Sequence, residues 1–212
     1  MKFVVKPADD SFEMMLEAGQ YARIWQEHSE TILNAFKNIT GLEFQQRLIT
    51  ARITNGTYGN AGLPGKAMIL PGNYAAEDRK ICTLMHELGH RLLGGNALNS
   101  VALGLVADTD ENFNDWQWYE HRHLYLFLHD AVADAFGPEY AERCTKDELN
   151  NEPEYYHEAW EWAMNLTFEQ RQRAVRLLTA EALPRNRWHE RDDLDEILPR
   201  DPAEWFKKLH PE

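Results

Sequence analysis

The stretch from residue 81 to residue 95, ICTLMHELGHRLLGG, decides how this chain is interpreted. Its large apolar residues recur at intervals of three and four, which predicts an amphipathic helix over residues 75 to 93; they are Ile81, Leu84, Met85, Leu88 and Leu92. His86 and His90 project from nearly the opposite side and lie one above the other. The two imidazoles can therefore point at a single ion, and the Gly-Gly pair that follows is a helix stop.

His86, Glu87 and His90 form the pattern H-E-x-x-H, whose spacing suits a helical zinc hydrolase. A zinc ion held by two neutral histidines and one carboxylate keeps a position for water, lowers the pKa of that water to about 7 and polarises a carbonyl. Glu87 lies beside the two ligands and can take the proton. The pattern predicts zinc ligands at His86 and His90 and a general base at Glu87.

A third ligand is expected from a second helix, predicted over residues 118 to 136 and ended by a Gly-Pro pair. At about 100° per residue, five of its residues fall within roughly 80° of arc: Glu120, His123, Phe127, Asp130 and Asp134. Asp130 can bind zinc while Asp134, one turn away, accepts the free N–H of a ligand histidine. Glu120 is the alternative ligand, and His123 can be a ligand, an orienting group or an oxyanion donor.

These motifs resemble those of the zincin metallopeptidases, specifically the gluzincin and minigluzincin kind. HELGH at residues 86 to 90 matches the zinc motif of that family, and DAVAD at residues 130 to 134 matches its downstream Glu-x-x-Ala-Asp signature with Asp in place of Glu. An aspartate third ligand is similar to the aspzincin variant. The resemblance implies zinc as cofactor, Glu87 as general base and peptide bonds as substrate.

The expected fold is α+β and zincin-like, with a small, mostly antiparallel sheet, an active-site helix and a helical C-terminal lobe. With 212 residues, 43% of them hydrophobic, the chain can form one domain around one core. We expect a sheet and active-site lobe over residues 1 to 93, a helical lobe over residues 94 to 183 and an extended tail over residues 184 to 212.

Further elements are predicted from local patterns. Residues from Ile24 to Ile39 mark a helix that Gly41 ends, and strands are expected over residues 1 to 7, 42 to 53 and 66 to 70. The segment 67 to 71 is a candidate for pairing with an extended substrate, or else an internal strand. An aromatic helix is expected from Tyr155 to Leu166, followed by a capping box formed by Thr167 and Gln170. Tyr155, Tyr156 and His157 are candidate oxyanion donors.

Charge and composition bear on partners and compartment. A net charge of -13 and a pI near 5.1 argue against binding to nucleic acid or to an anionic membrane surface, and favour basic peptides. No window approaches 18 uninterrupted apolar residues, and the amino terminus lacks the pattern of a secretory signal. Cys82 and Cys144 are expected to be buried thiols, which suits a reducing cytoplasm.

Two other functions are compatible with the sequence. The first is a zincin-fold regulatory or binding protein that keeps metal without turnover. The second is a helical interaction protein in which HELGH is coincidental, and this one predicts no stoichiometric zinc.

Overall fold

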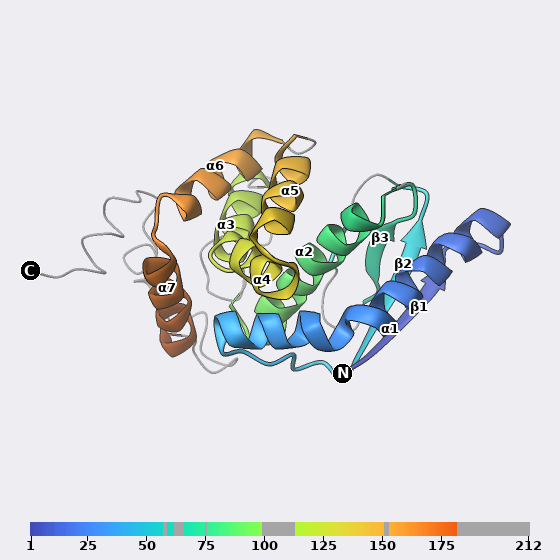
Figure 1. Cartoon of the computed structure of the whole chain (residues 1–212), viewed down its shortest axis with the longest axis horizontal. Coiled ribbons are helices and arrows are strands. Elements are labelled where there is room, and N and C mark those ends of the chain that lie inside the picture. Colours follow the sequence, from blue (N-terminus) through green and yellow to red (C-terminus); the bar gives the residue numbers. More distant parts are fainter. Residues whose placement is uncertain (57–58, 62–65, 75, 99–112, 151–152, 182–212) are drawn as a thin grey trace, which may run out of the picture.

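The computed structural model describes residues 1–56, 59–61, 66–74, 76–98, 113–150 and 153–181 (Figure 1). It is a mixed α/β structure, mostly helical, with one small sheet. The strands are β1 (Lys2–Pro7), β2 (Leu48–Thr54) and β3 (Met68–Pro71). The helices are α1 (Phe12–Thr40), α2 (Glu77–Gly95), α3 (Phe113–Tyr125), α4 (Leu128–Phe136), α5 (Pro138–Leu149), α6 (Glu154–Met164) and α7 (Phe168–Glu181).

The sheet has the order β1-β2-β3, and both strand pairs are parallel. The expectation of a mostly antiparallel sheet was therefore wrong. Antiparallel neighbours can be joined by a tight hairpin, whereas parallel neighbours need a long crossover. The 29-residue helix α1 provides that crossover between β1 and β2. The zincin-like fold is not established by this architecture.

The outer edge of β3 carries one further contact. Asn60 forms an isolated antiparallel bridge with Ile69, with both backbone hydrogen bonds at 2.9 and 2.7 Å. The strand expected at residues 67 to 71 is thus present at the end of the strand order. Its position as a substrate-pairing strand stays a prediction.

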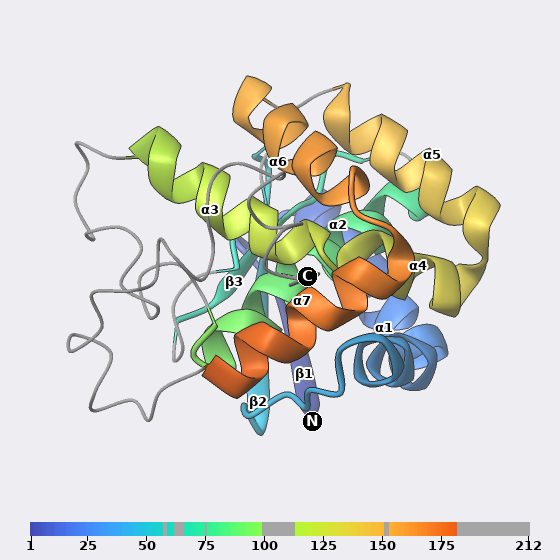
Figure 2. The ribbon, with the colours of Figure 1, turned by 90° about the vertical axis from the view of Figure 1, so that its left-hand side faces the viewer.

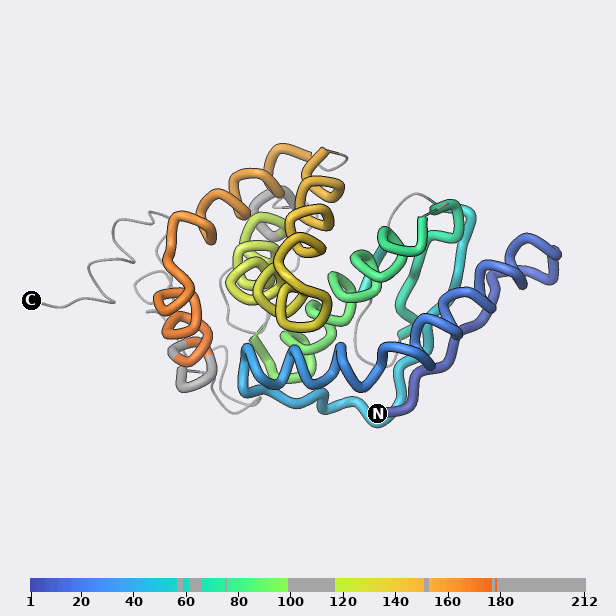
Figure 3. Tube along the Cα trace, in the orientation of Figure 1, coloured from blue at the N-terminus to red at the C-terminus, as the bar shows by residue number. Residues whose placement is uncertain are grey.

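The long helix α1 joins the sheet to the helical part of the molecule. Its N-cap is Ser11, whose side chain accepts a hydrogen bond from the Met14 amide, and Gly41 ends it in a left-handed conformation with φ 72°. Glycine suits that position because a Cβ disfavours positive φ. In Figure 3 the blue trace of α1 begins beyond the sheet and ends beneath α4, with which it packs. The predicted end of this helix at Gly41 is confirmed.

Helix α2, which carries the H-E-x-x-H pattern, lies between the sheet and helices α3, α4 and α5 (Figures 1 and 2). The predicted apolar stripe from Ile81 to Leu92 is fully buried in the core. Gly89 packs so closely against α3 that an added Cβ would collide with Leu124 Cδ1. The absence of a side chain at Gly89 therefore lets α3 approach the histidines of α2.

The second helix predicted over residues 118 to 136 is broken into α3 and α4. The break lies at residues 126–127, where Phe127 has φ -140° and ψ -18°. Farther along, the Thr167 and Gln170 capping box is confirmed: the Thr167 amide donates to Gln170 Oε1 at 2.7 Å, and the Gln170 amide donates to Thr167 Oγ1 at 3.3 Å. The predicted tail from residue 184 lies outside the described residues.

The two cysteines are joined, so the expectation of two free thiols was wrong. Cys82 of α2 and Cys144 of α5 form a disulfide across 62 positions of sequence. The two residues are far apart in sequence, and only the packing of α5 on α2 brings them together. Among the described helices, none has both the length and the apolar character needed to cross a membrane.

Candidate metal centre

Three histidines converge where α2 meets α3. His86 and His90 come from α2 and His121 comes from α3, and one ring nitrogen of each lies within 4.8 Å of the others. The His86 and His90 Nε2 atoms face one another at 3.1 Å. Two ligands about 2.0 Å from a tetrahedral ion lie about 3.3 Å apart, so this spacing can accommodate a metal ion, and it is not specific to zinc. The expected pairing of His86 and His90 on one side of α2 is confirmed.

His121 presents an unprotonated nitrogen to this group. Its Nδ1 lies 2.7 Å from the Gln117 carbonyl oxygen, which can only accept, so Nδ1 carries the hydrogen. Its Nε2 is then a lone-pair donor to a metal, and this buried atom has no hydrogen-bond partner within the described part of the chain. Burial, with the neighbouring His86 as a smaller cause, lowers the His121 pKa to about 3. The ring is therefore neutral at pH 7, as metal binding requires.

His90 is also held neutral. Burial, followed by the electrostatic influence of His86 and His121, lowers its pKa well below the ordinary value of 6.5. Its Nδ1 lies 3.9 Å from a Glu120 carboxylate oxygen, which is longer than a hydrogen bond. Glu120, the alternative ligand from the sequence, thus lies beside the histidine group but outside the set of three.

A carboxylate orients His86 from outside the group. His86 Nδ1 donates to Glu148 Oε1 at 2.7 Å, so its Nε2 faces the other histidines. The Tyr125 hydroxyl donates to the same Glu148 oxygen at 2.6 Å. Burial alone would raise the Glu148 pKa, but the His86 charge and the hydrogen bonds from His86 and Tyr125 outweigh it, and the pKa is lowered. Such partners fix the tautomer and direction of a ligand histidine.

Glu87 lies next to the histidines, in a pocket that His86, Glu148 and Tyr156 also line. Its side chain is buried, and Gly59 lies so close that a Cβ there would collide with the Glu87 carboxylate. The Tyr156 ring packs on the His121 ring with centroids 3.8 Å apart, and the Tyr155 centroid lies farther away, at 6.4 Å. Of the expected oxyanion donors, Tyr156 is therefore the one at the pocket.

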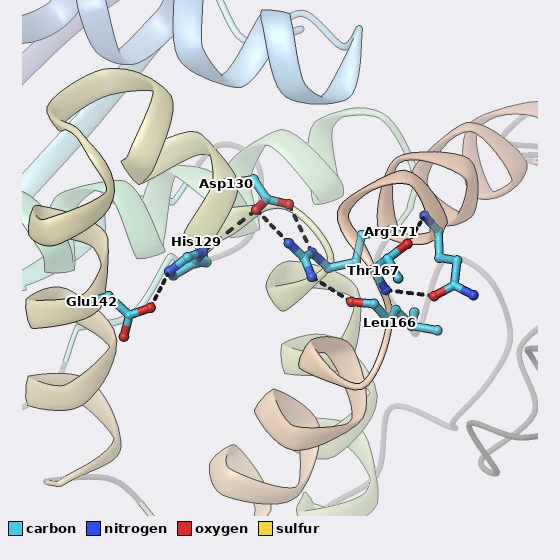
Figure 4. A network of polar contacts seen from close by, with 7 residues as sticks. His129, Asp130, Glu142, Leu166, Thr167 and Arg171 are labelled. Atoms are coloured by element: carbon cyan, nitrogen blue, oxygen red, sulfur yellow. Dashed lines mark hydrogen bonds and ion pairs between the residues drawn. The ribbon is translucent and has the colours of Figure 1, made fainter.

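Asp130 does not join the histidine group. Its two carboxylate oxygens accept hydrogen bonds of 2.9 and 2.7 Å from the Arg171 guanidinium of α7 (Figure 4). His129 lies on its other side, with Nδ1 3.7 Å from an Asp130 oxygen. The expected role of Asp130 as third ligand is thus replaced by a buried ion pair between α4 and α7.

Two further predicted residues also lie apart from the group. Asp134 is exposed and accepts a hydrogen bond of 3.1 Å from the Asn38 side chain, and His123 is fully buried, with burial lowering its pKa to about 3. The break between α3 and α4 explains these placements. A face projected along one straight helix from Glu120 to Asp134 is not continuous once the axis changes at residues 126–127.

The sequence interpretation missed His121, Tyr125 and Glu148. His121 and Tyr125 are four residues apart on α3 and therefore share a face, which is a signal that the sequence contained. The acidic residues of the same segment lie on another side of the helix, and they indicate a different face for the third ligand. Glu148 has no such signal, because its partner His86 is 62 positions away.

The Asp130 and Arg171 pair makes a stability prediction. Replacing Arg171 with Leu leaves a buried carboxylate without its cation, so we expect a loss of about 3 to 5 kcal/mol in the free energy of unfolding. Urea denaturation at pH 7, followed by circular dichroism, measures it. The double variant Arg171→Leu/Asp130→Leu should recover much of the loss, because it removes the stranded charge. A loss below about 1 kcal/mol would contradict a buried pair.

The same pair predicts a pH dependence. Burial alone would raise the Asp130 pKa, but His129 and Arg171 outweigh it and lower the pKa below the ordinary 3.8. A carboxylate with a depressed folded-state pKa stabilises the protein above its unfolded value and loses this contribution as the pH falls. The difference between wild type and Arg171→Leu should therefore shrink below pH 3.8.

Comparison of this chain with models of protein families, with curated proteins and with solved structures finds no match.

Proposed function

We propose that this protein is a zinc-dependent hydrolase and that peptide bonds are its substrate class. The convergence of three histidine nitrogens within 4.8 Å, beside a pocket lined by Glu87, carries the proposal. Three histidines with one open position are a ligand set of catalytic zinc sites. Peptide as substrate rests on the resemblance of HELGH to the zincin motif, and is an analogy.

The proposed ligands are His86, His90 and His121, with His121 in the place first expected for Asp130. The resemblance to gluzincins then extends to α2 and its base, but not to an acidic third ligand. The parallel sheet departs from the expected zincin architecture as well. The proposed reaction therefore depends on the residues of the site and not on the fold.

Each residue has a distinct proposed role. A zinc ion in this group would supply a Lewis acid that lowers the pKa of water and polarises a carbonyl. Glu87 would accept the proton of the attacking water and pass it to the leaving amine. Glu148 and Tyr125 keep His86 directed at the group. Tyr156, at the wall of the pocket, is the candidate donor to the developing oxyanion.

A metal-binding regulatory protein without turnover is the second candidate. The buried carboxylate of Glu87 and its close contact with Gly59 favour it, because a general base must be within reach of the attacking water and of the leaving amine. This candidate predicts zinc binding and no hydrolysis. The two candidates therefore share the metal and differ only in activity.

The compartment is also part of the proposal. The cytoplasmic location expected from the sequence depended in part on two buried thiols. Disulfides persist mainly in oxidising compartments, so the bond between Cys82 and Cys144 favours such a compartment instead.

The metal content of the purified protein tests the proposal. We expect about one zinc per chain by elemental analysis, and its loss in the double variant His86→Ala/His90→Ala. The variant His157→Ala is the control, because His157 belongs to none of the described residue groups that could hold a metal, so its loss should leave the zinc content unchanged. Zinc retained by the first variant, or little zinc in wild type after reconstitution, would refute the site. The helical interaction protein would then be the better account.

A further inference from the structure

The Cys82–Cys144 disulfide lies directly beside the contact that orients His86. Cys82 precedes His86 by four residues on α2, and Cys144 precedes Glu148 by four residues on α5. Residues four apart lie on the same face of a helix, about 6 Å along its axis. The disulfide and the hydrogen bond from His86 to Glu148 are therefore successive links between the same faces of the same two helices.

Further polar links between α2 and α5 are weaker. One is a hydrogen bond of 3.2 Å that the Tyr140 hydroxyl donates to the Asp78 carbonyl oxygen. The Arg79 and Asp147 side chains lie 3.3 Å apart, with 33% and 48% of their surfaces exposed, and Arg143 pairs with Asp78 at 3.5 Å, with both more than half exposed. Ion pairs of this kind contribute little in water. The disulfide, by contrast, is covalent, and Cys144 is buried. It is the stronger constraint on where Glu148 stands relative to His86.

We infer that the Cys82–Cys144 disulfide positions Glu148 against His86, so that its reduction weakens zinc binding by the three histidines. This inference depends on the proposed zinc site. Freed from the bond, α5 can shift relative to α2, and the His86 ring loses the partner that fixes its direction. Removing a residue that hydrogen-bonds to a metal-binding histidine weakens metal affinity by about 10- to 100-fold.

The bond is placed where a small reductant can reach it. Cys82 is only partly buried, and both cysteines line two pockets. One pocket contains His86, Glu87 and Glu148, and the other contains Tyr140 and Arg143. Reduction by a small thiol breaks the S–S bond, leaves two protein thiols and joins two molecules of the reductant in a new disulfide. The two electrons and two protons thus come from the reductant.

Zinc affinity in the two redox states tests the inference. We would measure competition with a chelating dye for oxidised wild type, for wild type reduced with a phosphine, and for Cys82→Ser/Cys144→Ser. A phosphine is used as the reductant in preference to a dithiol, because dithiols bind zinc. The phosphine takes an oxygen atom from water and becomes a phosphine oxide, and the two protons of that water end on the two cysteine thiols. We expect about tenfold weaker binding in the reduced protein and in the serine variant. The serine variant excludes zinc binding by the new thiols.

Glu148→Ala separates positioning from a general loss of stability. In that background His86 has no carboxylate to be positioned, so oxidised and reduced protein should bind zinc within about twofold of each other. A tenfold difference that persists without Glu148 would overturn the inference, as would equal affinities of oxidised and reduced wild type. Reduced wild type keeps the test available should the serine variant fail to fold.

The same data separate the inference from the proposed function. If both redox forms bind zinc equally, the role of the disulfide is refuted and the metal site is not. If oxidised wild type binds no zinc, both the proposed function and this inference are refuted.

Discussion

Replacing His121 with Ala is expected to weaken zinc binding by at least about 100-fold. Structural zinc sites bind with apparent free energies of roughly 10 to 16 kcal/mol, or about 3 kcal/mol for each of four ligands, which corresponds to more than 100-fold in affinity. His121 Nε2 is a buried lone pair with no hydrogen-bond partner among the described residues, so its burial is compensated when a metal binds. Competition titration with a chelating dye measures the change.

Asp130→Asn and Glu120→Gln are the controls for this experiment. Asp130 is committed to Arg171, so Asn at this position should lower stability and leave the zinc affinity of the folded protein within about threefold. Glu120 lies 3.9 Å from His90 Nδ1, and its neutral replacement should weaken binding by at most about tenfold. Zinc lost in Asp130→Asn and kept in His121→Ala would restore the aspartate as third ligand.

Replacing Glu87 with Gln is expected to abolish most hydrolysis while zinc remains bound. General acid–base catalysis contributes about 10²- to 10⁴-fold, so the catalytic rate of the zinc-loaded variant should fall by that factor. Gln has nearly the shape of Glu, so it fits the contact with Gly59 that a larger change would disturb. Peptide hydrolysis by zinc-loaded wild type and variant is measured side by side, with zinc content determined for each.

Glu120→Gln serves again as the matched control, because it removes a carboxylate near His90 but not the proposed base. It should retain most of the activity. Wild type that binds zinc yet hydrolyses peptides no faster than Glu87→Gln would exclude the hydrolase and favour the regulatory metal protein.

Much of the local structure could be predicted because its causes lie within a few residues. The helix that ends at Gly41, the apolar stripe of α2 and the capping box of Thr167 and Gln170 all depend on neighbours in sequence. The strands at residues 1 to 7 and 66 to 70 were found for the same reason. The parallel direction of strand pairing could not be predicted in this way, because it depends on the end of the sheet to which α1 brings the chain back.

The candidate site divides in the same way. His86, Glu87 and His90 follow from a helical period and were identified from five consecutive residues. Asp130 was expected as the third metal ligand because residues 118 to 136 were projected as one straight helix. Two residues of turn at 126–127 were enough to turn Asp130 toward Arg171 and leave His121 beside α2.

The sequence by itself determined the helical framework and the two histidines with their neighbouring glutamate, since periodicity and capping are local. Only the tertiary structure decided the parallel sheet, the disulfide between Cys82 and Cys144, and the partners His121 and Glu148. These features join residues 17 to 62 positions apart, and their contact depends on how the strands and helices pack. A glycine at position 89, which admits α3 to the side of α2, is one physical reason that they meet.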